Sequence, residues 1–297
     1  MQPYPILLAP YVSEAVWGGR RLAEEYGVDP GGKANCAEAW VLSAHPKGSA
    51  SIRNGALTGQ SLAAVAAQKP AWFGGKPLGV LVKLIDAREA LSVQVHPTDG
   101  APCLRPGEAG KTECWYILDA APGASLTLGF REQITKATFE RAIRENALSD
   151  LLRKQPVRRG DFFFIPAGTL HAIGAGVLLA EVQQSSDTTY RVFDYNRQPP
   201  RELHISQALC AAELAPYAAK EALPLRCPYF SVAEWQGARQ GAPPQDAFLS
   251  LLVLDGRTQL AAAGEVLPLR KGDCVLLPAG MGGYTLESGA HILAVQG

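Results

Sequence analysis

Two segments of the chain, 112 residues apart, repeat one pattern of turn, strand and bend. The first, "RRGDFFFIPAGTLH", covers residues 158–171, and the second, "RKGDCVLLPAGMGG", covers residues 270–283, and the two align without a gap. In each copy Gly-Asp is typical of a turn, four apolar residues predict a strand, and Pro-Ala-Gly predicts a bend after it. A repeated strand with the same flanking turns favours a fold that is built twice. We therefore expect two similar halves made mainly of strands.

The rest of the chain supports a mainly β fold. Its 30 Gly and 22 Pro punctuate short apolar runs such as "KPLGVLVKLIDA", "LSVQVHP", "TECWYILDA", "ASLTLGF" and "GVLLAEVQQSS", each of which predicts a strand. Residues 138–154 instead have apolar side chains at helical spacing, with Thr138 as the expected N-cap and Pro156 as the stop. A second helical stretch is expected over 204–223.

The spacing Gly-x5-Pro-x-Gly-x2-His in the first copy resembles the second sequence motif of the cupins, which are small antiparallel jelly-roll barrels. Two copies imply two cupin-type barrels with a small helical insertion at about 135–155. We expect a catalytic, metal-binding domain over 1–205, and a linker helix with a degenerate cupin domain over 206–297. The first copy ends in His171 where the second has Gly283, so only the first barrel is expected to hold a metal.

Cupin metal sites draw their ligands from a His-x-His pair, a later Glu and the histidine of the second motif. In "LSVQVHP" the alternation of polar and apolar residues places Gln94 and His96 on one face of a strand, where His-x-His would stand. The following strand offers Glu113. The resemblance thus implies a metal set of Gln94, His96, Glu113 and His171, a combination that suits Zn²⁺. Three histidines lack comparable partners and are expected to be structural or surface residues: His45, His204 and His291.

Several segments are together similar to the type I mannose-6-phosphate isomerases, in their short bacterial form. They are "LSVQVHP", "GKTECWY", "IPAGTLHAIGAG" and "AEVQQSSDTTYRVFDYNR", with "VWGG", "AEAW" and "LSAHP" nearer the N-terminus. The resemblance implies the interconversion of mannose 6-phosphate and fructose 6-phosphate by metal-assisted proton transfer through an enediol or enediolate. It also implies one zinc ion per chain.

The same resemblance assigns three further residues to the active site. Lys-Thr-Glu supplies Lys111, which precedes Glu113 by two residues and would lie on the same strand face as a proton carrier. The segment "SSDTTYR" supplies Asp187 and Arg191. The fixed charge of Arg191 could stabilise the enediolate, or the pair could shuttle protons. No phosphate-binding residue can be assigned from the sequence.

Composition restricts the partners. The 28 basic and 28 acidic residues balance, which argues against nucleic acid or a membrane surface as a partner. Six scattered cysteines without a Cys-x-x-Cys pair are typical of a reduced, cytoplasmic protein. We expect a small sugar phosphate as the ligand and a monomer or homodimer as the assembly. The open alternatives are another metal-dependent cupin enzyme, such as a sugar epimerase or dioxygenase, and a sugar-binding double cupin without catalysis.

Overall fold

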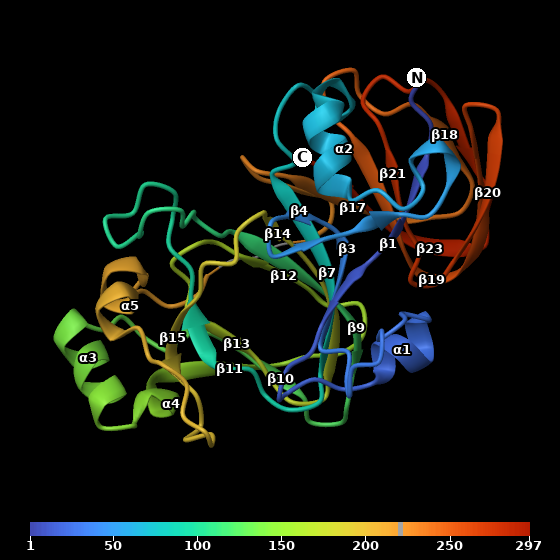
Figure 1. The fold of residues 1–297 in the computed structure, drawn as a ribbon. Coiled ribbons are helices and arrows are strands. Elements are labelled where there is room, and N and C mark those ends of the chain that lie inside the picture. Colours follow the sequence, from blue (N-terminus) through green and yellow to red (C-terminus); the bar gives the residue numbers. More distant parts are fainter. Residues whose placement is uncertain (219–221) are drawn as a thin grey trace. The chain divides into compact units, whose positions relative to one another are not determined.

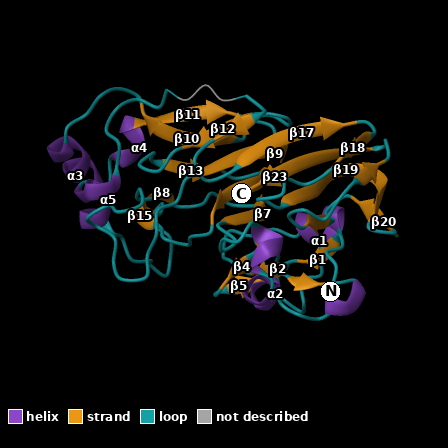
Figure 2. Cartoon of the chain, turned by 90° about the horizontal axis from the view of Figure 1, so that it is seen from above, coloured by secondary structure: helices purple, strands orange, loops and turns teal. Residues whose placement is uncertain are grey.

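The structure, a computed structural model, describes residues 1–218 and 222–297. These residues form 23 strands, five α-helices and two short 3-10 helices, which confirms the mainly β prediction (Figures 1 and 2). The recorded pairs between these strands are antiparallel, as in the jelly-roll barrels of cupins.

The chain forms two compact units that do not follow its order. One contains Met1–Ala15, Arg20–Ile85 and Ala222–Gly297, and the other contains Val16–Gly19 and Asp86–Glu221. The first unit therefore takes strands from both ends of the chain. The expected division at residues 205 and 206, and the closure of each half into a barrel, stay predictions.

The first unit is built around a ten-stranded sheet. Seven strands follow the order β16-β17-β23-β19-β21-β1-β6. Three more strands extend the sheet: β20 and β22 each pair with β19, and β18 pairs with β22. The strands of this sheet are β1 (Ile6–Ala9), β6 (Ser51–Ile52), β16 (Leu225–Arg226), β17 (Ser231–Gln236), β18 (Arg239–Gly241), β19 (Leu249–Ala262), β20 (Glu265–Arg270), β21 (Cys274–Leu277), β22 (Tyr284–Leu286) and β23 (Ala290–Gln296). Their inward side chains make an apolar core that includes Leu251, Leu260 and Val275.

The remaining elements of this unit are short. A second antiparallel set pairs β2 with β3 and β3 with β7, and β4 pairs with β5. These elements are β2 (Tyr11–Ser13), β3 (Glu38–Leu42), β4 (Ala44–His45), β5 (Gly48–Ser49), β7 (Val80–Ala87), α1 (Arg21–Tyr26), α2 (Leu62–Gln68), η1 (Gly55–Leu57) and η2 (Pro70–Phe73). Strand β7 continues along the chain into the second unit.

The sequence repeat is also a structural repeat. Strands β12 (Phe162–Ile165) and β21 occupy the same positions of the two copies, 112 residues apart. Before each strand an aspartate closes the turn: Asp161 accepts the Arg158 N–H at 2.9 Å, and Asp273 accepts the Arg270 N–H at 2.9 Å. The turn glycines also match, with φ of 89° at Gly160 in the first copy and 91° at its counterpart in the second.

The second unit holds two sets of antiparallel strands. One is a five-stranded sheet in the order β11-β10-β13-β8-β15, and in the other β9 lies between β12 and β14. The additional strands are β8 (Val93–Val95), β9 (Glu113–Ala120), β10 (Ser125–Phe130), β11 (Leu152–Pro156), β13 (His171–Ile173), β14 (Val177–Gln184) and β15 (Tyr190–Phe193). Helices α3 (Lys136–Arg144), α4 (Leu148–Leu151) and α5 (Ile205–Ala211) cover one face of the five-stranded sheet (Figures 1 and 2). Val93 and Val95 of β8 pack into that helix-covered core, so Gln94 between them faces the opposite side.

The helical predictions need correction. The stretch 138–154 is not one helix, because α3 ends at Arg144, Asn146 adopts a left-handed φ of 59°, and β11 takes residues 152–156 into a pair with β10. Thr135, not Thr138, caps α3 by accepting the Thr138 N–H at 3.1 Å. Among the described residues of the stretch 204–223, only Ile205–Ala211 is helical, and residues 219–221 lie outside the described part of the chain.

In the part of the chain that the structure describes, none of the helices has the length and apolar character needed to cross a bilayer.

Candidate metal centre and active site

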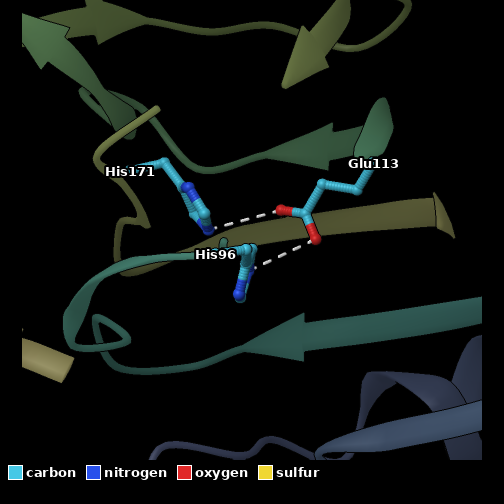
Figure 3. Close-up of side chains that lie close together, drawn as sticks. All are labelled: His96, Glu113 and His171. Atoms are coloured by element: carbon cyan, nitrogen blue, oxygen red, sulfur yellow. Dashed lines mark ion pairs between the residues drawn. The ribbon is translucent and has the colours of Figure 1, made fainter. Parts of the chain in front are cut away.

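Three ionisable side chains from different strands meet in the second unit. His96 directly follows β8, Glu113 is the first residue of β9, and His171 is the first residue of β13. Their ligand atoms all lie within 4.8 Å of one another, and each residue is 1% exposed or less (Figure 3). The Nε2 atoms of His171 and His96 face the two carboxylate oxygens of Glu113 at 3.3 and 3.6 Å. The structure thus brings together three of the four predicted ligands in one buried cluster.

Both histidines are held with the same ring nitrogen turned toward the cluster. Nδ1 of His96 lies 2.8 Å from the carbonyl oxygen of Thr188, and Nδ1 of His171 lies 2.9 Å from that of Thr169. A carbonyl can only accept, so each Nδ1 carries a proton, and the neutral form of each ring then presents its lone pair at Nε2. Burial, aided by the charge of Lys111, lowers the pKa of His171 to about 4, which keeps that ring neutral near pH 7. Neutral imidazoles with a fixed tautomer are the form that binds a metal.

Gln94, the fourth predicted ligand, lies beside this cluster. It is the register partner of His171 on β13, and its amide is 3.2 Å from Nε2 of that histidine. The oxygen and nitrogen of a carboxamide exchange places by a simple rotation of the side chain, so Gln94 can present either a donor or an oxygen ligand there.

Lys111 reaches into the same cluster. Its ammonium contacts Glu113 Oε2, lies 3.2 Å from Nε2 of His96, and is 3.8 Å from Glu181 Oε1. Lys111 is 4% exposed and Glu181 is 3% exposed, so this charge arrangement is shielded from water. The ammonium and a metal ion would compete for the same lone pairs, and Glu181 offers the ammonium a second carboxylate to which it can turn.

Arg191 lies on the same cross-strand line as Gln94 and His171. Across the five-stranded sheet, Gln94 on β8 is opposite His171 on β13 and also opposite Arg191 on β15. Cross-strand partners present their side chains on the same face, with neighbouring strands about 4.8 Å apart. The guanidinium is oriented by two bonds, from Nε to Ser92 Oγ at 3.2 Å and from Nη1 to the Glu202 carbonyl at 3.0 Å. Its other N–H groups can therefore meet a ligand beside Gln94.

Asp187, the remaining predicted residue, is placed differently. It is exposed on the segment between β14 and β15 and is not part of the buried His–Glu–His cluster. The neighbouring residues of this segment instead act as supports, because Thr188 holds His96 and Ser186 Oγ donates to the Ala109 carbonyl at 3.0 Å.

Sequence reasoning missed two buried polar residues on β14. Glu181 accepts the indole N–H of Trp115 at 2.9 Å, and Gln183 is the register partner of Glu113 with its amide bonded to the carbonyls of Gln184 and Ser186. The signal was present in "VLLAEVQQ", where two polar residues at i and i+2 interrupt a strand that is otherwise apolar.

The donor set fits a zinc ion. Two neutral imidazole nitrogens and one carboxylate are a common set of three protein ligands at catalytic zinc sites, which leave a position open. The carbonyl bonds at both Nδ1 atoms are the outer contacts that orient ligating histidines.

Comparisons with known proteins show the family of the chain. Residues 6–109 match the family model "Phosphomannose isomerase type I, catalytic domain", and residues 220–296 match "Mannose-6-phosphate isomerase, cupin domain". A mannose-6-phosphate isomerase of Streptococcus mutans is 36% identical, over 98% of this chain and 97% of that protein. The crystal structure of the mannose 6-phosphate isomerase of Bacillus subtilis covers 100% of both chains at 35% identity and a TM-score of 0.90. A zinc-bound mannose 6-phosphate isomerase shares the fold at 18% identity, over 98% of each chain, with a TM-score of 0.76.

Proposed function

Because the chain belongs to the type I phosphomannose isomerase family, we propose that the cluster of His96, Glu113 and His171 is the centre of its isomerase site. The chain is an aldose–ketose isomerase that interconverts mannose 6-phosphate and fructose 6-phosphate. The observation that carries the location is the convergence of two imidazoles and a carboxylate in a buried place, next to a lysine and an arginine.

The cluster is proposed to hold one zinc ion per chain, with Gln94 as an additional oxygen ligand. When bound, zinc supplies a Lewis acid that polarises the oxygens of the sugar and stabilises the negative charge of an enediolate. The corresponding place in the second copy of the repeat is Gly283, which has no side chain to offer. The oligomeric state, monomer or homodimer, and the cytoplasmic location stay predictions.

Lys111 and Arg191 are proposed to carry the chemistry that the ligands do not. The isomerisation moves a proton between neighbouring carbons, and Lys111 Nζ is the movable proton-bearing atom closest to the cluster. Once a metal occupies the lone pairs that Lys111 contacts, the ammonium can turn toward Glu181 and toward a sugar. Arg191 has further N–H donors besides those bonded to Ser92 and Glu202, and these are proposed to stabilise an oxyanion. Asp187 is the proposed partner of Arg191 in a proton shuttle.

The test combines metal analysis with a coupled assay of mannose 6-phosphate conversion. His171→Ala and Glu113→Ala should each lose most bound zinc and nearly all turnover, because each removes a side chain that binds the zinc directly. His291→Ala, at a half-buried position beside Glu234 in the other unit, is the control and should keep both. Stoichiometric zinc and normal turnover in either ligand variant would show that the ligand set is wrong.

A further inference from the structure

Strand β15, which carries Arg191, is the edge strand of its sheet. An edge strand leaves backbone N–H and C=O groups without a neighbouring strand to bond them. At Arg191 both groups are bonded by one residue: the Arg191 N–H donates to Nδ1 of His204 at 3.2 Å, and the His204 N–H donates to the Arg191 carbonyl at 2.8 Å. His204 thus takes the place of a missing strand at this single position.

The backbone at this position determines where the guanidinium points. The register of β15 against β8 shifts between Arg191 and Phe193, and such an irregularity allows a strand to re-aim a side chain. The bond from the guanidinium to the Glu202 carbonyl comes from the same returning segment, two residues before His204. The segment therefore fixes Arg191 at its main chain and at its side chain.

The ring of His204 makes this contact with Nδ1, while its Nε2 lies 3.8 Å from Glu202 Oε2. His204 is the N-cap of α5, a position where Asn, Asp, Ser or Thr usually bonds the helix, yet its side chain makes no capping bond. Its side chain is 17% exposed, and the ring packs 6.1 Å from the ring of Tyr190. The ring of His204 is thus used for Arg191 rather than for the helix that it begins.

We propose that His204 is a positioning residue, whose Nδ1 lone pair and backbone N–H hold Arg191 in the orientation that the isomerase reaction needs. This inference rests on the role of Arg191 in the proposed function. His204 is not part of the cluster of His96, Glu113 and His171, and in this role it acts through Arg191.

The test uses two polar replacements of similar size. In His204→Asn the amide oxygen lies where Nδ1 was and can still accept the Arg191 N–H, whereas in His204→Gln the polar atoms lie nearer the position of Nε2. We expect His204→Gln to lower kcat by about 10- to 100-fold, the scale for a misplaced catalytic group, with a smaller change in KM and full zinc content. His204→Asn should stay within about threefold of the unchanged enzyme, since it preserves that acceptor. Thermal melting checks that both variants fold.

A double-mutant cycle with Arg191→Met separates positioning from general damage. If His204 acts through Arg191, adding His204→Gln to Arg191→Met should change kcat by less than about twofold, because the partner is already gone. The same loss in both backgrounds, or equal loss in the Asn and Gln variants, would overturn the proposal. Normal turnover of Arg191→Met alone would instead remove the proposed role of Arg191, so the two failures are distinguishable.

Discussion

The metal-stripped protein should lose stability in mild acid through one buried histidine. His171 is 1% exposed, and burial together with the nearby Lys111 charge lowers its pKa to about 4. In the unfolded chain its pKa returns to about 6.5. Between these two values the unfolded chain binds a proton that the folded chain does not. The free energy of unfolding therefore falls as the pH falls from about 6.5 toward about 4, and the contribution is fully present only above that window.

The size of this loss follows from the two pKa values. At pH 5 the histidine is largely protonated in the unfolded chain and still neutral in the folded one, whereas at pH 7 it is mostly neutral in both. With about 1.4 kcal/mol for each pH unit inside the window, His171 alone removes about 2 kcal/mol between pH 7 and pH 5.

Urea unfolding of the metal-stripped protein, followed by far-ultraviolet circular dichroism at pH 7 and pH 5, measures this difference. His171→Gln is the matched control, because an amide cannot take up the proton. The unchanged protein should lose about 2 kcal/mol more than His171→Gln over this interval. Equal losses in the two proteins would mean that burial does not keep His171 neutral in the folded chain.

Three further substitutions separate the roles of neighbouring residues. Lys111→Met should keep its zinc and lower turnover by about 10²- to 10⁴-fold, the scale of a lost acid–base group, and unchanged turnover in the coupled assay would contradict its role as the proton carrier. Arg191→Met should lower kcat more than it raises KM if Arg191 stabilises charge that develops in the transition state, whereas a raised KM with normal kcat would restrict it to phosphate binding. Trp115→Phe removes the donor to buried Glu181 and should cost about 1–3 kcal/mol in urea unfolding; a smaller cost would mean that water replaces the indole.

The sequence predicted those parts of the fold that depend on local patterns. The repeat at 158–171 and 270–283 has identical strand and turn positions in the structure, because Gly-Asp turns and apolar runs are specified by a few adjacent residues. The grouping of the N-terminal strands with the C-terminal ones could not be read in this way. The pair of β1 with β21 joins Leu7 to Val275, and no local pattern records so distant a partner.

The helix over 138–154 shows where local patterns mislead. Leu152 lies at helical spacing from its apolar predecessors, but the backbone of residues 152–156 pairs with β10, and a tertiary pair of this kind overrides propensity. The helix cap is Thr135 and not the expected Thr138, because either threonine near the helix start can serve as a cap and the sequence does not distinguish them.

For the site, motif and alternation placed Gln94 and His96 on one face, and the structure confirms that the neighbouring valines face the helical layer instead. Glu181 and His204 were not found, for different reasons. Glu181 could have been noticed as a charged residue in a buried strand. His204 meets the backbone of Arg191 through its ring Nδ1 and its own N–H, and no local pattern relates two residues that are 13 positions apart.

Anomalous X-ray diffraction at the zinc absorption edge, on crystals of the zinc-loaded protein, locates the ion itself. We expect one peak per chain, at about 2.0–2.1 Å from Nε2 of both His96 and His171 and at a similar distance from a carboxylate oxygen of Glu113. No peak at this cluster, or a second peak held by side chains of residues 222–297, would contradict it.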